Sequence, residues 1–291
     1  MKKYLILPSS SDQNRGDQAL VWETIKIAKK AGFSGEFYVL SSDIKNTMQS
    51  IEEGIKIATP ILKHPGRKFK TKENISYNFI LLAKWGFVAF FDLFMSLLLL
   101  TRYTRFLINP FLSKANKETL RLIIESDACF VKGGGFIHSV GRLTDSYTVY
   151  FQLFHLLLAQ SFGKPIYIMP NSFGPFYGLA VIWLLRKTFR KCKLITVRES
   201  ISCMKLNEIG LTSKIYPDLG FFLEKNFFLS EDIIKIYNLY PERKLVGITV
   251  RPYRFPEEED PMGKYNNYLQ GILDFSKWIY RNGFLPVFIE H

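Results

Sequence analysis

The sequence has 291 residues, of which 47% are hydrophobic and 15% aromatic, so the chain can bury a large core and lacks the composition of a disordered segment. Its 39 Lys and Arg residues outnumber its 26 Asp and Glu residues, and the net charge of +13 favours an acidic partner such as a phosphate-bearing substrate or an anionic lipid surface. The basic residues form short scattered clusters without a nucleic-acid-binding motif, so we expect no nucleic-acid partner. The three cysteines have neither metal-binding nor disulfide spacing, and we expect a cytoplasmic protein with no metal site.

Short apolar segments alternate with helical patterns along residues 1–225. The expected strands, the third of which runs into a glycine loop, are 3–8, 35–43, 128–135, 164–170, 193–199 and 213–218. The expected helices are 17–32, 117–127, 146–163, 178–192 and 200–210, and Asp17 is expected to cap the first of them. Strands and helices that alternate in this way are typical of a parallel sheet covered on both faces. We therefore predict an α/β, Rossmann-like lobe over 1–225 with a hydrophobic helical insertion at about 44–126.

One segment, 79–100, is apolar almost all round but contains Lys84 and Asp92. The uncharged run after Asp92, residues 93–101, is too short to cross a membrane, and a span would place Asp92 near the bilayer centre, which is costly. The following residues, 101–106, include the aromatic and basic types found at lipid interfaces. A buried or partner-covered helical hairpin is the leading interpretation, a helix on the membrane surface is the second, and a span is the least favoured.

A second α/β lobe is expected over 226–291. The patterns predict a strand at 243–252, a helix at 264–283 and a strand at 284–291. Two strands and one helix make an incomplete lobe, which we interpret as the start of a truncated domain. Arg251, at the end of the first of these strands, is expected to face a cleft between the two lobes.

Five of the expected strands in the first lobe are followed by loops rich in polar residues and glycine. These loops are 9–18, 132–139, 170–176, 198–202 and 217–222. Because the carboxyl ends of parallel strands meet at one edge of a sheet, we expect the loops to converge on one ligand site. Gly133, Gly134 and Gly135 are the strongest signal, since adjacent glycines are costly in chain entropy and let a ligand approach the backbone closely. A tight turn or a packed segment is the alternative interpretation.

Several of these residues suit an anionic ligand. Arg198 can bind a carboxylate or a phosphate through two hydrogen bonds, although an ion pair with Glu199 would explain its presence as well. Lys132 adds a point charge next to the backbone N–H groups of the glycine triplet. His138 can donate to the same anion or transfer a proton, and a structural role is the alternative.

The remaining candidates suit a ligand that carries hydroxyl groups. Asp17 can orient Asn14 or accept a proton from a sugar hydroxyl, besides capping its helix. Asn171 can hydrogen-bond a sugar hydroxyl, whereas Gly174, with the proline after it, most simply makes a rigid turn. Asp218 is the second candidate carboxylate.

Five short elements follow one another along the chain: NRGDQAL at 14–20, KGGGFIH at 132–138, PNSFGPF at 170–176, VRESIS at 197–202 followed by LNEIGL, and YPDLGFFL at 216–223. Together they resemble the polysaccharide pyruvyl transferase family. The resemblance implies a GT-B-like arrangement of two α/β lobes. It also implies transfer of the enolpyruvyl group of phosphoenolpyruvate onto two hydroxyls of a sugar in a cell-surface polysaccharide precursor, which leaves a cyclic ketal and phosphate. Phosphoenolpyruvate is then the donor substrate, and no cofactor is expected.

The resemblance implies that an arginine in the position of Arg198 binds substrate. We predict that Asp17, His138 and Asp218 are catalytic. The predicted substrate-binding residues lie in the strand-end loops and in the second lobe; they are Asn14, Gly16, Lys132, Gly133, Gly134, Gly135, Asn171, Gly174, Arg198 and Arg251. The family's later S-x-R-x-H element has no counterpart in the sequence, so we expect the general acid to lie in a missing C-terminal part.

Two other functions are compatible with the sequence. One is a GT-B-like glycosyltransferase that uses a nucleotide sugar, and the other is a non-catalytic scaffold or sugar-binding member of the same pathway. Dinucleotide binding of the Rossmann type is disfavoured, because the first loop has one glycine where the fingerprint needs three. A pyruvyl transferase would act in the cytoplasm, and at the inner face of the membrane if 79–106 contacts lipid and the acceptor is lipid-linked.

Overall fold

The computed structural model describes residues 1–8, 10, 12–41, 47–62, 79–142, 144–224, 235, 238, 242–251, 253, 255 and 258–289, with only the backbone described at 79–82. The chain divides into two compact units, Met1–Leu223 and Glu224–His291, and each is described by itself. The first unit contains all five of the strand-end loops that the sequence singles out.

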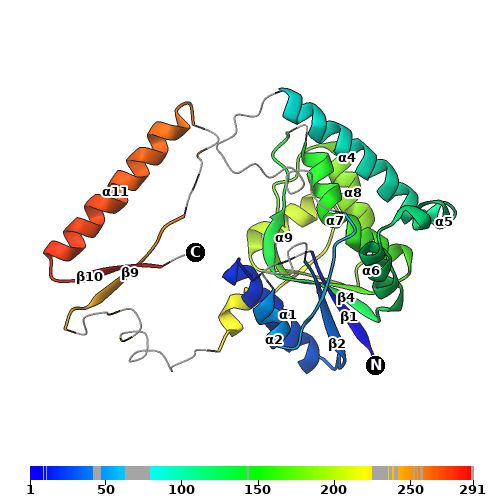
Figure 1. Cartoon of the computed structure of the whole chain (residues 1–291), viewed down its shortest axis with the longest axis horizontal. Coiled ribbons are helices and arrows are strands. Elements are labelled where there is room, and N and C mark those ends of the chain that lie inside the picture. The colour runs from blue at the N-terminus through cyan, green and yellow to red at the C-terminus, as the bar shows by residue number, and fades with distance from the viewer. Residues whose placement is uncertain are drawn as a thin grey trace. The chain divides into compact units, whose positions relative to one another are not determined.

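Among the described residues, the first unit is built on an eight-stranded parallel sheet (Figure 1). Its strands are β1 (Lys3–Leu7), β2 (Glu36–Leu40), β3 (Lys56–Ala58), β4 (Ala128–Val131), β5 (Gly134–Ile137), β6 (Ile166–Phe173), β7 (Leu194–Val197) and β8 (Lys214–Ile215). They lie in the order β3-β2-β1-β4-β6-β7-β8, and β5 pairs with β6. All four residues of β4 are buried, as expected for a central strand of a parallel sheet.

The strand order reverses between β1 and β4. The chain runs from β1 to β2 and β3 on one side of this point, and from β4 to β6, β7 and β8 on the other. In open parallel sheets a ligand binds outside the carboxyl ends of the strands at such a reversal, because the loops leave in opposite directions and open a crevice. The residues directly after β1 and β4 are therefore placed where a site is expected.

Helices cover both faces of the sheet. The helices described in the first unit are α1 (Arg15–Lys30), α2 (Met48–Glu52), α4 (Phe79–Leu100), α5 (Arg105–Ile108), α6 (Lys114–Glu125), α7 (Asp145–Ser161), α8 (Leu179–Phe189), α9 (Ser200–Glu208) and the 3-10 turns η2 (Asn109–Phe111) and η3 (Leu219–Phe222). Within β1, Tyr4 and Ile6 pack with residues of α1, whereas Leu5 and Leu7 pack with residues of α6 and α7. This period of two creates one core on each face of the sheet. The predicted α/β class is therefore confirmed.

Helix α1 begins at Arg15 and not at residue 17. Its N-cap is Asn14, whose Oδ1 accepts a hydrogen bond of 3.1 Å from the backbone N–H of Asp17. The prediction that Asp17 is the N-cap is therefore wrong: Asp17 lies in the first turn, where its charge complements the helix dipole. Asn and Asp cap helices about equally well, so the residue types alone do not separate the two choices. This register leaves the Asp17 carboxylate for another partner.

The region predicted as an insertion, 44–126, contributes to the sheet and to its cover. Within it, β3 pairs with β2, and α6 packs against β1 and α7. Helices α4 and α5 and turn η2 lie between these two elements along the chain. The sequence Lys56–Ala58 is too short to give a recognisable strand pattern, which is why the sheet position of β3 was not predicted.

The second unit contains a parallel pair of strands, β9 (Leu245–Thr249) and β10 (Leu285–Ile289), connected through helix α11 (Pro261–Arg281). Asp260 caps α11, since its Oδ1 accepts a hydrogen bond of 2.9 Å from the backbone N–H of Gly263. These elements match the strand, helix and strand expected in this region. A parallel pair needs a crossover of this kind, so the unit is a βαβ motif.

His155 in α7 has a structural role. It is 5% exposed, and its Nε2 accepts a hydrogen bond of 3.1 Å from the backbone N–H of Ile61. Burial lowers the pKa of His155 to about 3, because a charged ring at this position would lack the water that stabilises it in solution. The neutral imidazole thus holds the chain after β3 against α7.

This burial predicts a pH dependence of stability. Between the ordinary histidine pKa of about 6.5 and the folded value of about 3, the unfolded chain binds a proton that the folded chain does not, so stability falls as the pH falls. We expect the His155 contribution to drop by about 2 kcal/mol between pH 7 and pH 5. Urea unfolding of the wild type and of His155→Gln, which keeps an acceptor but does not titrate, measures this. Equal pH slopes in the two proteins would show that His155 is charged in the fold.

Candidate functional site

A buried lysine lies at the reversal of strand order. Lys132 follows β4 and is 2% exposed, and its Nζ lies 2.6 Å from Oδ1 of Asp17 in the first turn of α1. Burial lowers the pKa of Lys132, and the Asp17 carboxylate opposes this by favouring the charged form. The ion pair joins the end of β4 to the start of α1. Lys132 is therefore committed to Asp17, and the prediction that it offers a free point charge to a ligand needs this correction.

The three glycines have different surroundings. A Cβ on Gly133 would lie 3.0 Å from the carbonyl oxygen of Pro170, and Gly134 has a φ of +148°, which side-chain-bearing residues rarely adopt. Gly134 and Gly135 belong to β5 instead of a loop. Gly135 is exposed, and a Cβ on it would lie 3.5 Å from Nη2 of Arg198. The predicted ligand loop is thus mostly a packed segment, and Gly135 is the member beside the arginine.

Asn171 is a positioning residue. It lies within β6, is 1% exposed, and its Nδ2 donates hydrogen bonds of 2.8 Å to the carbonyl oxygens of Lys132 and Met169. Its burial leaves no room for the predicted contact with a sugar hydroxyl. Gly174 makes the expected turn: its φ is +88°, and a Cβ would lie 3.1 Å from the side chain of Lys205.

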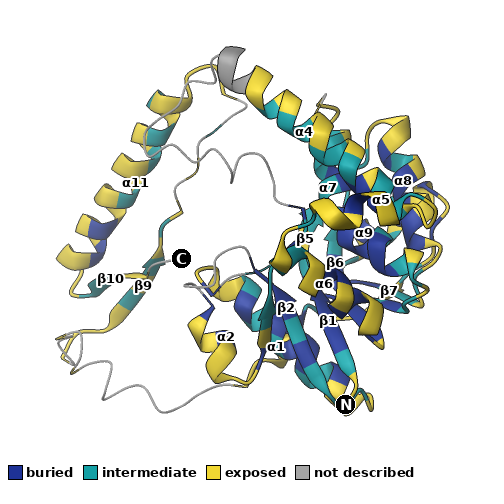
Figure 2. Ribbon diagram, turned by 45° about the vertical axis from the view of Figure 1, so that its right-hand side comes forward, coloured by how far each residue is buried: buried dark blue, intermediate teal, exposed yellow. Residues whose placement is uncertain are grey.

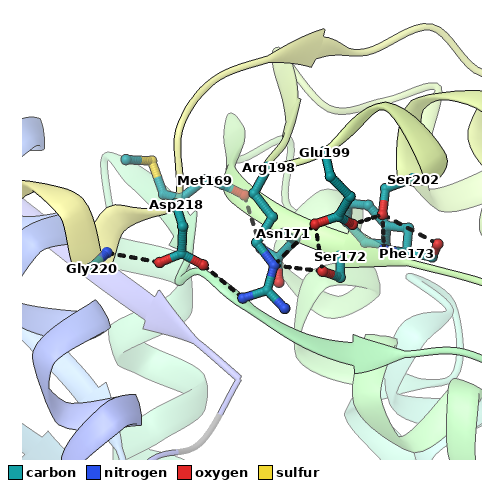
Figure 3. A network of polar contacts seen from close by, with 9 residues as sticks. All are labelled: Met169, Asn171, Ser172, Phe173, Arg198, Glu199, Ser202, Asp218 and Gly220. Atoms are coloured by element: carbon teal, nitrogen blue, oxygen red, sulfur yellow. Dashed lines mark hydrogen bonds and ion pairs between the residues drawn. The ribbon is translucent and has the colours of Figure 1, made fainter.

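Arg198 is the centre of a polar network at the carboxyl ends of the strands (Figure 3). Its Nη1 donates a hydrogen bond of 2.6 Å to Oδ2 of Asp218, and its Nε donates to Oγ of Ser172. The same Nε lies 3.3 Å from Oε2 of Glu199. The alternative interpretation of Arg198, an ion pair with a neighbouring acid, is thus present, with Glu199 and Asp218 as its partners. Ligand binding by Arg198 stays a prediction.

The partners of Arg198 are themselves fixed. Asp218 is the N-cap of η3, and its Oδ1 accepts a hydrogen bond of 2.7 Å from the backbone N–H of Gly220. Glu199 accepts hydrogen bonds from Ser172 and Ser202, and Ser202 in turn accepts one of 2.7 Å from the backbone N–H of Phe173. Each contact restricts a rotamer, so the guanidinium is held in one orientation before any ligand binds.

One edge of this guanidinium is available. Nη2 of Arg198 makes no hydrogen bond or ion pair with the residues that the structure describes, and the side chain is 32% exposed. An open pocket of about 510 Å³ lies at this point, and its lining includes Arg198, Glu199, Asp218 and the exposed Phe221. A cation that faces a pocket with free donors is what a carboxylate or phosphate ligand requires.

The charges at this edge of the sheet nearly cancel. Lys132 and Arg198 are paired with Asp17, Asp218 and Glu199, which leaves one excess negative charge. Because only Nη2 of Arg198 is without a described partner, an anionic ligand that binds the guanidinium through two oxygens must replace a carboxylate on it.

The structure places the other predicted residues less centrally. Asn14 and Gly16 are exposed at the start of α1. His138 is exposed directly after β5, and its side chain makes no hydrogen bond or ion pair with a residue that the structure describes. Arg251 follows β9 in the second unit, where its backbone N–H donates to the hydroxyl of Tyr268 at 3.3 Å. Its expected position in a cleft between lobes stays a prediction.

Sequence reasoning missed Ser172 and Ser202 and treated Glu199 only as a competitor for Arg198. These residues instead carry the hydrogen bonds that orient the guanidinium. Ser172 lies in the motif NSF and Ser202 in the motif RESIS. Their position beside the expected strand ends was the sequence signal that could have predicted a role at the site. Within the described part of the chain, no cluster of three His, Cys, Asp or Glu side chains could hold a metal ion.

The parallel sheet defines an α/β protein, and the fixed arginine at its carboxyl edge marks a candidate ligand site at the strand ends. The sequence profile of the polysaccharide pyruvyl transferase family matches residues 14–289, nearly the whole chain, and the chain belongs to this family. The resemblance found in the sequence is thereby confirmed, and the family is by its description one of transferases.

Two solved structures are similar to the chain. UDP-N-acetylglucosamine 2-epimerase from Rickettsia bellii is 12% identical with a TM-score of 0.45, and the match covers 100% of this chain and 62% of that one. MurG from Acinetobacter baumannii is also 12% identical, with a TM-score of 0.32 and coverage of 86% of this chain and 50% of that one. The chain thus spans less than two thirds of the length of either protein. No curated protein matches the sequence of the chain.

Proposed function

We propose that the protein transfers the enolpyruvyl group of phosphoenolpyruvate onto two hydroxyls of a sugar in a cell-surface polysaccharide precursor. The observation that carries this proposal, beside membership of the family, is the pre-oriented guanidinium of Arg198, which lines a pocket and whose Nη2 makes no hydrogen bond or ion pair with a described residue. We propose a cytoplasmic location, where phosphoenolpyruvate is made, and the reaction needs no cofactor in addition to the donor.

The donor fits the site through its anionic groups. Phosphoenolpyruvate carries a carboxylate and a phosphate, and either presents two oxygens to a guanidinium in the planar geometry that arginine favours. Because the site already holds one excess carboxylate, the donor takes the place of Asp218 on Nη1 of Arg198. Donor binding thus releases the Asp218 carboxylate next to the bound anion, where it can accept a proton from an attacking hydroxyl.

The group transfer balances in this scheme. A proton is added to the methylene carbon of the enol, and C2 becomes electrophilic. Two sugar hydroxyls form C–O bonds to C2, and the C–O bond to phosphate breaks, so the products are one cyclic ketal and one phosphate. Of the two hydroxyl protons, one replaces the proton used at the methylene carbon and the other leaves with the phosphate. Arg198 stabilises the negative charge of the donor during these steps.

The ion pair of Lys132 with Asp17 places a second carboxylate at the same edge of the sheet as Arg198 and Asp218. Asp17 has about a third of its side chain exposed, and Lys132 fixes its position at the reversal of strand order. We assign Asp17 the role of orienting or deprotonating an acceptor hydroxyl, and Lys132 the role of positioning Asp17. Neither Lys132 nor Asn171 contacts substrate in this proposal, because both are buried.

A binding measurement tests the donor assignment. Phosphoenolpyruvate at about 100 times its dissociation constant stabilises the fold by about 2.7 kcal/mol if it binds only the folded chain, and this raises the thermal midpoint. We expect such a shift in the wild type and its loss in Arg198→Ala, with inorganic phosphate as the weaker control ligand. A shift produced only by nucleotide sugars would replace this proposal with a glycosyltransferase, and no shift with either class of ligand would favour a non-catalytic member.

A further inference from the structure

Helix α4 has two different apolar faces. Met95, Ser96 and Leu99 face the protein, and Oγ of Ser96 lies 2.7 Å from the hydroxyl of Tyr150 in α7. The opposite stripe faces solvent, and Phe87 and Phe90 are 73% and 70% exposed. In Figure 2 the described part of α4 is exposed or intermediate almost throughout, whereas α7 contains a run of buried residues. Burial within the chain, one form of the leading expectation, is therefore wrong, because the helix leaves most of its described aromatic side chains exposed, whereas cover by a partner stays a prediction.

The exposed aromatic stripe continues beyond the helix. We call it the aromatic face; its exposed members in α4, α5, η2 and the turn between them are Phe87, Phe90, Phe91, Phe94, Leu97, Tyr103, Phe106, Leu107 and Phe111. These side chains come from consecutive elements that pack on one another. Exposed apolar side chains gathered on neighbouring elements in this way mark a candidate binding surface.

The face is held rigidly at its centre by Arg105. Its Nε donates a hydrogen bond of 2.9 Å to the carbonyl oxygen of Leu99, its Nη2 donates one of 2.8 Å to Oγ of Ser161, and its guanidinium stacks on Phe162. A cation that caps the last carbonyls of a helix stabilises that end. The C-terminal half of α4 and the following α5 are therefore fixed on α7.

This attachment argues against a membrane span. The window Ala83–Leu100 has a mean hydropathy of 1.7 and is long enough to cross a membrane, and 11% of it is buried in the fold. A span would have to remove Ser96 and Leu99 from their contacts and place Asp92 in hydrocarbon. A helix that keeps one face on the protein and offers the other lies in the plane of an interface.

The surrounding charges identify the occupant. Exposed cations flank the aromatic face at both ends: Lys84 lies in the first part of α4, Arg102 lies in the turn after it, and Lys114 and Lys117 lie in α6 directly after η2. The whole chain has a net charge of +13. Aromatic side chains bordered by Lys and Arg match the acyl boundary and the anionic headgroups of a phospholipid surface.

A pocket under the aromatic face adds a second feature. It has a volume of about 540 Å³, and its lining includes Phe91, Met95, Leu99, Ile108 and Phe111. Phe91 and Phe111 also belong to the exposed stripe, so the pocket and the aromatic face share their border. The lining also includes Asp92, Ser96 and Asn116, so the pocket does not suit a hydrocarbon chain, and the docking argument rests on the exposed aromatic face itself.

We propose that the aromatic face docks the protein on an anionic phospholipid membrane, with α4 lying along the surface and its Ser96 side kept on the protein. This proposal does not depend on the proposed function, because docking requires neither donor nor acceptor. It commits to a lipid surface as the occupant, and a second copy of the chain is the alternative that the test excludes.

Sedimentation of the full-length protein with vesicles measures the docking. We expect binding to vesicles of phosphatidylcholine with about one third phosphatidylglycerol, and weak binding to phosphatidylcholine alone. The variant Phe87→Ser/Phe90→Ser/Phe94→Ser should need at least tenfold more anionic lipid for half-maximal binding. The charge variant Lys84→Glu/Arg102→Glu should weaken binding to anionic vesicles only, and high salt should have the same effect on the wild type.

The matched control is Met48→Ser/Ile51→Ser in α2, because these side chains are also exposed and apolar but lie outside the aromatic face. Its binding should equal that of the wild type, and circular dichroism should show all variants folded. The proposal would be overturned if the wild-type protein did not bind anionic vesicles, or if the triple variant bound them as well as the wild type. A wild-type dimer that the triple variant converts to a monomer would assign the face to a second copy and overturn it as well.

Discussion

Replacing Arg198 by alanine is expected to reduce kcat/KM for phosphoenolpyruvate by roughly 100- to 1000-fold, the range found when a charge-stabilising donor is removed from an active site. The reason is that Arg198 is the cation among the described residues that line the pocket, and its Nη2 makes no hydrogen bond or ion pair with a described neighbour. The change should leave the fold stable, since Arg198 is partly exposed and Asp218 keeps its bond to Gly220. Phosphate release with saturating acceptor measures the loss.

Two variants define what the arginine supplies. Arg198→Lys keeps the charge but not the planar fork, so it should recover only a small part of the activity. Arg121→Ala removes an exposed cation of α6 that is not at the site, and its activity should equal that of the wild type. If Arg198→Ala retained wild-type kcat/KM, the donor would bind elsewhere, and the role assigned to this network would be wrong.

Replacing Asp17 by asparagine is expected to destabilise the first unit by about 3 kcal/mol, because it leaves the charge of Lys132 buried without a partner. The expected cost lies at the lower end of the range for buried pairs, since Asp17 is about one third exposed. Lys132→Met removes the buried charge and should cost less. The double variant should therefore be close in stability to Lys132→Met alone.

The pH dependence of stability shows whether Asp17→Asn destabilises the fold through the buried charge of Lys132 or through a general loss of packing. Burial lowers the pKa of Lys132, so at alkaline pH the unfolded chain holds a proton that the folded chain gives up, and stability increases with pH. Asp17→Asn removes the group that opposes this shift. Urea unfolding at pH 7 and pH 9 should accordingly show a larger gain for Asp17→Asn than for the wild type. Equal stability of the wild type and Asp17→Asn at pH 7 would contradict the structural role of the pair.

The sequence predicted the layers of the first unit well because each strand and helix carries its own local signal. The apolar runs in β1 and β4 and the periodic pattern of α7 are examples, and the rule that parallel strands align their carboxyl ends then brought the loops together. This reasoning predicted Arg198 and Asp218 as site residues. It did not predict the ion pair between Lys132 and Asp17, because no local sequence pattern shows which charged residues meet across the sheet.

The errors have physical causes of the same kind. The extension of β6 through Asn171 and the pairing of β5 with it turned an expected ligand loop into a packed strand, and glycine residues favour either outcome. Helix α4 is apolar on all sides, so only the packing of Ser96 against Tyr150 shows which face is turned inward. Local propensity decides elements, whereas tertiary contacts decide the register and the orientation of a helix.

The most direct test of the proposed activity is the pyruvate ketal content of the surface polysaccharide of the source cell. Proton NMR detects the methyl group that the transfer creates from the enol methylene. The ketal signal should be present in wild-type cells, absent after deletion of the gene, restored by the wild-type gene, and not restored by Arg198→Ala. Polysaccharide that keeps its ketal after deletion, or that loses a sugar residue instead, would contradict the assignment of the protein as a pyruvyl transferase that acts through Arg198.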